Sequence, residues 1–184
     1  GLFTFGDGVS NNLYYTIALS RNNTYTNPIF PLGGSQFSVS AKVSFPYSLV
    51  TNIDYGNLGE QPAYQNTDGT PDQAKIDQEK FKWLEYYKLK FSGSWYSTII
   101  DKLVLKTHTE FGYLGAYNTD RGIIPFERFY LGGDGLSQYA LDGRETISMR
   151  GYENQSLSER DGATIYNKFS LELRYPITLK PSAS

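Results

Sequence analysis

The sequence contains no cysteine and a single histidine, and these two shortages exclude several kinds of site. Without cysteine the chain has no disulfide, no thiolate nucleophile and no cysteine-based zinc site. His108 has no second histidine or cysteine with which to complete a metal site, so we interpret it as one polar residue of an inward-facing strand surface. The sequence also shows no nucleophile–base pair, metal cluster or phosphate-binding loop, and we therefore expect neither an enzyme nor a cofactor.

Two further absences concern membranes and partners. No apolar run reaches the roughly 18 residues that a spanning helix needs. This excludes helical membrane proteins but not transmembrane strands, whose alternating side chains are polar on average. The formal net charge of −2 leaves no basic surface for nucleic acid, which is therefore not an expected partner. The chain starts without methionine or a signal peptide, which suggests a mature segment or an excised fragment.

Aromatic residues, in contrast, are abundant. The chain holds 16 tyrosines, 11 phenylalanines and 2 tryptophans, so that 16% of its residues are aromatic. Such residues favour strands over helices. Tyrosine and tryptophan also favour boundaries between water and an apolar phase.

Five segments alternate apolar and polar residues with the two-residue period of a β-strand. The clearest spans residues 36–45, where Phe37, Val39, Ala41, Val43 and Phe45 form one face and Ser38, Ser40 and Lys42 belong to the other. The other four segments are Leu13–Ser20, Phe81–Trp95, Leu103–Tyr113 and Ile165–Tyr175. In the second of these, Trp83 and Trp95 share a face at a spacing that suits the two aromatic girdles of a membrane barrel. The pattern predicts an all-β fold.

The connections between these segments alternate in length. We expect short connections at 27–34 and 97–101, and long polar ones at 49–80 and 118–162, with a short helical turn over 74–80. Outer-membrane barrels have this alternation, with the long loops outside the cell and the apolar strand faces toward lipid. A soluble β-sandwich or jelly roll is the competing interpretation. Five strands cannot close a barrel, so residues 1–184 are predicted to be a partial barrel domain.

The last long connection contains two glycine-rich turns and one well-spaced cation. Gly132 and Gly133 form the first turn. Arg150 directly precedes Gly151, so the backbone can enter a left-handed conformation just after the charge and hold the guanidinium toward a fixed partner. A surface loop with a solvated arginine is the alternative interpretation.

Four motifs, taken in order, resemble the BamA-like family of outer-membrane assembly factors. They are Asn27-Pro-Ile-Phe-Pro-Leu-Gly-Gly-Ser-Gln-Phe, Phe126-Glu-Arg-Phe-Tyr-Leu-Gly-Gly, Met149-Arg-Gly-Tyr and Ser170-Leu-Glu-Leu-Arg-Tyr-Pro. The insert between Gly133 and Arg150 is longer than in the proteobacterial pattern and is similar to the version found in Bacteroidota.

The resemblance implies a sixteen-stranded transmembrane antiparallel β-barrel, of which this chain supplies about five strands. It also implies that Arg150, within the motif completed by Gly151 and Tyr152, folds into the lumen and meets an acidic partner on a neighbouring strand. Glu172 matches that partner. The tyrosine at 152 stands where phenylalanine is more frequent in the family.

The function implied by the resemblance is the folding and insertion of β-barrel proteins into the outer membrane of a Gram-negative cell. The implied partners are outer-membrane lipid, unfolded barrel clients and, in the full-length protein, accessory assembly lipoproteins. A two-partner secretion pore or related translocation pore of the same superfamily is the first alternative, and a soluble β-sandwich binding module is the second.

Overall fold

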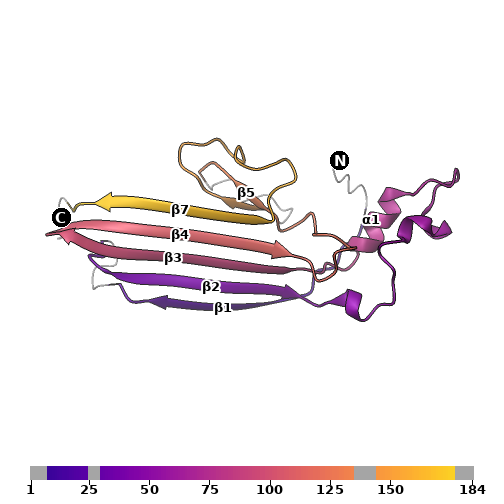
Figure 1. Ribbon diagram of the computed structural model, residues 1–184, viewed down its shortest axis with the longest axis horizontal. Helices are drawn as coiled ribbons and strands as arrows, with labels where there is room; N and C mark the ends of the chain where they lie inside the picture. Colours follow the sequence, from indigo (N-terminus) through magenta and orange to yellow (C-terminus); the bar gives the residue numbers. More distant parts are fainter. Residues whose placement is uncertain (1–7, 25–29, 135–143, 177–184) are drawn as a thin grey trace, which may run out of the picture. The chain divides into compact units, whose positions relative to one another are not determined.

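The computed structural model describes residues 8–24, 30–134 and 144–176. Five long strands form one sheet in the order β1-β2-β3-β4-β7. Their bounds are β1 Tyr14–Asn22, β2 Gly34–Ser44, β3 Tyr87–Ile100, β4 Leu103–Gly115 and β7 Ile165–Arg174. Successive strands point in opposite directions (Figure 1), so the sheet is antiparallel and the predicted all-β class is confirmed.

The connections between the strands alternate in length, as the sequence predicts. Residues 45–86 separate β2 from β3 and residues 116–164 separate β4 from β7, whereas only Asp101 and Lys102 lie between β3 and β4. Asp101 adopts a positive φ of 50°, which suits the tight turn of a hairpin. The motif that begins at Asn27 lies partly outside the described residues.

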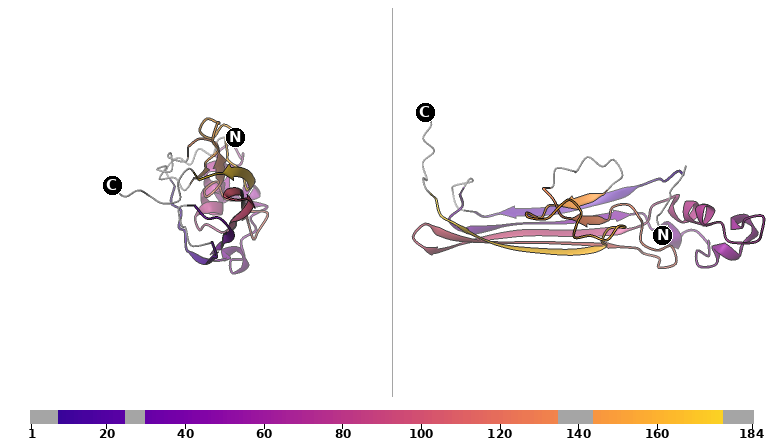
Figure 2. Two further views of the ribbon diagram at one scale, coloured as in Figure 1. Left: turned by 90° about the vertical axis from the view of Figure 1, so that its left-hand side faces the viewer. Right: turned by 90° about the horizontal axis from the view of Figure 1, so that it is seen from above.

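The connection between β2 and β3 is folded around a small core of its own. It contains the 3-10 turns η1 (Tyr47–Leu49), η2 (Leu58–Glu60) and η3 (Pro62–Tyr64) and the helix α1 (Gln73–Phe81). Figure 2 shows these short helical elements close to one another. The Asp72 carboxylate caps α1 by accepting a hydrogen bond from the Lys75 N–H at 3.3 Å. Tyr55, Leu58 and Ile76 form the buried cluster beneath these turns. The helical turn predicted over 74–80 is confirmed.

The predicted position of the third strand is wrong. The sequence pattern starts it at Phe81 and turns it at 97–101, but β3 begins at Tyr87 and continues to Ile100. Phe81 instead ends α1 and is buried, and Trp83 lies outside the strand. The apparent alternation therefore continues into residues that are not strand, namely the end of α1 and the segment up to Tyr86, and the two tryptophans do not share a strand face.

The chain divides into two compact units. Unit 1 comprises Gly1–Thr16, Lys42–Lys88 and Tyr113–Ile165, and it includes both long connections. Unit 2 comprises Ile17–Ala41, Leu89–Gly112 and Tyr166–Ser184, and it consists mainly of strand segments.

In unit 2 one face of the sheet exposes large apolar side chains that a water-soluble protein would bury. Leu19, Val39 and Leu171 are 70%, 43% and 62% exposed, while Ser94 on the other face is only 3% exposed. We call these the apolar face and the polar face of unit 2. An exposed apolar surface of this kind indicates contact with a membrane or a protein. Further members of the apolar face are Ile17, Phe37, Leu89, Trp95, Phe111, Phe169 and Leu173.

The soluble β-sandwich predicted as an alternative requires a second sheet that covers the apolar face. All the described strands of unit 2 belong to a single sheet, so the sandwich interpretation finds no support there. Among the described residues, no helix is long and apolar enough to cross a membrane.

We predict that Val39→Arg, near the middle of β2, destabilises the protein in lipid vesicles by about 2–4 kcal/mol, because the guanidinium would replace an apolar side chain facing hydrocarbon. The matched change Ser38→Arg, on the polar face, should cost much less. The free energy of folding into vesicles measures both. Equal costs for the two variants would contradict the assignment of the faces.

A candidate loop-docking site

Glu127 is the loop residue that joins the long connection after β4 to two strands. Its Oε1 lies 2.5 Å from the Lys42 Nζ of β2, and its Oε2 lies 3.2 Å from the Lys88 Nζ of β3. Lys88 Nζ also donates to the Glu127 carbonyl at 2.9 Å. One loop residue therefore holds two strand lysines through its carboxylate and its backbone.

Glu127 adopts a left-handed backbone conformation, with φ of +63°. This conformation costs a residue with a Cβ about 1–2 kcal/mol. Such strain persists where surrounding contacts impose it, often at a functional position. Here the contacts are those to Lys42 and Lys88, so the ion pairs and the strained turn depend on one another.

Glu145 completes the charge balance of the site. Its Oε2 lies 2.6 Å from Lys88 Nζ. Glu145 belongs to the short strand β6 (Glu145–Ile147), which pairs in parallel with β5 (Phe129–Leu131). We call Lys42, Lys88, Glu127 and Glu145 the docking cluster; it contains two cations and two anions.

Lys88 is the most deeply buried member of the docking cluster, with 4% of its side chain exposed. An ammonium group has three N–H donors. Three acceptors lie within 3.2 Å of it, namely the Glu127 carbonyl and one carboxylate oxygen each from Glu127 and Glu145. The charge is thus fully paired, as burial requires.

Aromatic rings enclose the docking cluster. Lys42 Nζ lies 4.0 Å from the centroid of the Tyr14 ring, and Lys88 Nζ lies 4.6 Å from that of Phe129. Both distances allow a favourable interaction of a cation with the ring face. Burial raises the pKa of the Tyr86 hydroxyl, so this neighbour of Lys42 is neutral at ordinary pH.

A second buried ion pair joins the two long connections. Arg121 Nη1 lies 2.7 Å from Glu85 Oε2, and both side chains are at most 5% exposed. The guanidinium also donates to the carbonyls of Lys80 and Trp83, one of which belongs to the last turn of α1. The Glu85 carboxylate accepts from the Ser48 N–H at 2.7 Å and from its hydroxyl at 2.6 Å. No local pattern in the sequence predicts this network.

The predicted loop motifs lie together within unit 1. The Gly133 N–H donates to the Tyr152 carbonyl at 3.1 Å, and the Met149 N–H donates to the Gly133 carbonyl at 2.9 Å. Gly132 and Gly133 have φ of +124° and +84°, and a Cβ on either would collide with the segment at 153–154. Glycine is therefore required there for conformation and for close approach.

The predicted contact between Arg150 and Glu172, which we call the brace, involves residues that lie as follows. Arg150 and Tyr152 are exposed, and Gly151 has the left-handed conformation predicted for it, with φ of +87°. Glu172, on β7, lies 3.7 Å from Lys106 Nζ and 3.4 Å from Arg174 Nε. Arg150 belongs to unit 1 and Glu172 to unit 2, so their pairing stays a prediction.

Unit 2 contains a polar network that no pattern in the sequence predicts. Ser94 Oγ lies 2.8 Å from His108 Nδ1, and Glu110 Oε1 lies 2.7 Å from His108 Nε2. A serine beside a base is therefore present, contrary to the expectation from sequence. Across the described ranges, no group of three acidic or histidine side chains is placed to hold a metal ion.

We predict that Glu127→Ala loosens the long loop, because it leaves Lys42 and Lys88 each short of an anionic partner at a mostly buried site. The free energy of local opening should fall by about 2 kcal/mol or more. Hydrogen exchange of the amides at 126–131 measures this change. Glu159→Ala, an exposed position in the same loop, serves as the control. Equal protection in the two variants would show that the ion pairs do not hold the loop.

Comparison with known proteins places this chain in a family. Residues 6–184 match the model of the Omp85 superfamily domain. A comparison with curated proteins found no match. Proteins of this superfamily are outer-membrane β-barrels that insert or translocate other proteins. Because the match covers nearly the whole chain, the chain belongs to the Omp85 superfamily.

Proposed function

We propose that the chain is the barrel portion of a BamA-like assembly factor of the Bacteroidota type, which folds and inserts β-barrel proteins into the outer membrane of a Gram-negative cell. The superfamily supports insertion or translocation in general. The four motifs from Asn27, Phe126, Met149 and Ser170 support the finer assignment. The expected partners are outer-membrane lipid, unfolded barrel clients and accessory lipoproteins.

The observation that carries this proposal is the docking of the long loop. Lys88 is almost fully buried beneath Glu127 and Glu145, and the glycine turn at 132–133 is bonded to the segment at 149–152. A translocation pore has to clear its lumen to pass a polypeptide, which would break the contacts of a buried charge. An insertase that works at the edge of its barrel has no such need, so a firmly docked loop favours the insertase.

A two-partner secretion pore or related translocation pore is the alternative. The observation that favours it is the hydroxyl-rich polar face of unit 2, where Ser20, Ser38 and Ser92 border a cavity. Such a surface is compatible with the passage of an extended polar chain.

The proposed function is tested with the full-length protein in lipid vesicles. An insertase should increase the rate at which an unfolded barrel client becomes resistant to protease in the vesicle membrane. Vesicles without the protein provide the control. Passage of an unfolded secreted substrate into the vesicles, with no acceleration of client folding, would support the translocation pore instead.

The membrane topology follows from the lengths of the connections. We predict that 49–80 and 118–162 lie outside the cell, and that the turn at Asp101–Lys102 and the connection at 27–34 lie in the periplasm. Epitope tags within the two long loops should bind antibody on intact cells. A tag inserted at Asp101–Lys102 should bind only after the outer membrane is opened, and its detection on intact cells would contradict the proposed orientation.

The brace implied by the family motif also gives a prediction. If Arg150 pairs with Glu172 in the full-length protein, Arg150→Ala and Glu172→Ala each loosen the loop, and the double variant is less damaging than the sum of the two. Protease sensitivity of the loop measures all three. Strict additivity would exclude the pairing.

A further inference from the structure

Ser94, His108 and Glu110 form a chain of hydrogen bonds on the polar face of unit 2. Ser94 belongs to β3, while His108 and Glu110 are two residues apart on β4 and so share its face. The distance from Ser94 Oγ to His108 Nδ1 is 2.8 Å, and that from His108 Nε2 to Glu110 Oε1 is 2.7 Å. Both are within reach for proton transfer.

The charge of Glu110 decides which atom of this chain carries each proton. Lys168 Nζ lies 3.2 Å from the same Glu110 Oε1 and favours the ionised carboxylate. A carboxylate accepts hydrogen bonds and donates none, so His108 Nε2 carries the hydrogen between them. In the neutral ring His108 Nδ1 then has a lone pair. The Ser94 hydroxyl donates to that lone pair and is directed toward a base.

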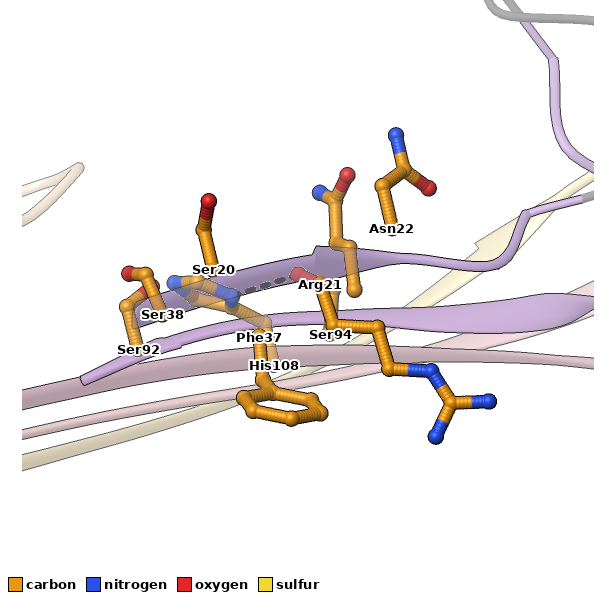
Figure 3. Close-up of a pocket in the computed structure, with 9 residues that line it drawn as sticks. Ser20, Arg21, Asn22, Phe37, Ser38, Ser92, Ser94 and His108 are labelled. Carbon is orange, nitrogen blue, oxygen red and sulfur yellow. Dashed lines mark hydrogen bonds between the residues drawn. The ribbon is translucent and has the colours of Figure 1, made fainter. Parts of the chain in front are cut away.

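A cavity of about 270 Å³ opens beside Ser94 and His108. Figure 3 shows Ser20, Asn22 and Ser38 rising from one side of the strands, while Phe37 projects from the other; its dashed line joins Ser94 and His108. The volume is slightly below the range for small-molecule pockets, which begins at about 300 Å³. A ligand of this site is therefore small.

The lining of the cavity supplies hydrogen-bond donors. The side-chain oxygen Oδ1 of Asn22 accepts from the N–H of Thr24 at 3.0 Å and from its hydroxyl at 2.9 Å, which leaves the side-chain amide nitrogen Nδ2 of Asn22 to donate. The Gln36 amide lines the same cavity. Amide donors beside a nucleophile can stabilise the oxyanion that forms when a carbonyl is attacked.

We propose that Ser94 is a nucleophile that hydrolyses short-chain carboxylic esters in this cavity, with His108 as its base and Glu110 as the residue that positions His108. This activity is separate from protein insertion, and it rests on unit 2 alone. A serine bonded to an imidazole that is oriented by a carboxylate is the arrangement that generates an activated hydroxyl.

The reaction balances with water as the second reactant. Ser94 Oγ bonds to the acyl carbon while its proton passes to His108 Nδ1. The ester C–O bond then breaks, and the leaving alkoxide takes that proton to become an alcohol. Water attacks the acyl-serine and gives a proton to His108. The bond from Ser94 Oγ to the acyl carbon breaks, the serine recovers the proton, and the carboxylic acid leaves.

The test is the labelling of the full-length protein, purified in detergent, by a fluorescent fluorophosphonate, together with its hydrolysis of p-nitrophenyl acetate. The variants are Ser94→Ala, His108→Ala and Glu110→Gln. Ser170→Ala is the control, because Ser170 is an exposed serine on the polar face of β7. Heat-dependent mobility on a gel confirms that each variant is folded.

We expect wild type and Ser170→Ala to be labelled equally, with the probe attached at residue 94. Ser94→Ala should lose both labelling and hydrolysis, and His108→Ala should slow both by about 100-fold or more. Glu110→Gln should slow them by about 10-fold or more, because it removes the carboxylate that fixes the imidazole tautomer. Labelling of folded Ser94→Ala at the wild-type rate, or the absence of labelling and hydrolysis in the wild type, would overturn the proposal.

Discussion

A buried ammonium group requires anionic partners. The almost fully buried Lys88 finds these partners in the long loop that follows β4. The strand that carries it provides none of its three acceptors; they come from Glu127 and Glu145 in the long loop. The loop is therefore bonded to the strands by charge, in addition to the burial of apolar loop side chains such as Phe129 and Ile124. The left-handed backbone at Glu127 is a consequence, because it presents a carbonyl and a carboxylate to the same nitrogen. Lys42 then shares the Glu127 carboxylate, which extends the contact to a second strand.

The apolar side chains of the strands have the complementary role. In unit 2 residues such as Leu19 and Leu171 are exposed, while Ser94 is buried on the opposite face. This distribution is stable only where the exposed apolar face meets lipid or another apolar surface. It agrees with membership of the Omp85 superfamily. Polar interactions and buried side chains such as Tyr96 and Val104 thus stabilise the face that carries Ser94. The opposite, apolar face is stabilised by the lipid or apolar surface that it contacts.

The sequence predicted the features that depend on local periodicity. Alternation identified the strands that became β1, β2, β4 and β7, and the polar stretch at 74–80 predicted α1. The predicted start of β3 is wrong because Phe81 and Trp83 continue the two-residue spacing of Tyr87, although Phe81 is the last residue of α1 and Trp83 lies outside the strand.

The docking cluster could not be predicted because Glu127 and Lys88 are 39 residues apart in the sequence. Their contact depends on the path by which the long loop folds back onto the strands. Lys42 and Lys88, both on polar strand faces, were the available signal, since buried cations require anions. The network of Ser94, His108 and Glu110 was missed for a similar reason, since it depends on the register between β3 and β4.

A double-mutant cycle on Lys88 and Glu127 tests most directly whether charge holds the loop to the strands. Lys88→Met and Glu127→Gln remove each charge with little change in side-chain length, and hydrogen exchange at 126–131 reports the free energy of loop opening in the full-length protein. We predict a coupling energy of about 1–3 kcal/mol, with the double variant little worse than the more damaging single variant. Additivity to within about 0.5 kcal/mol would show that the two residues act independently and would contradict a loop docked by ion pairs.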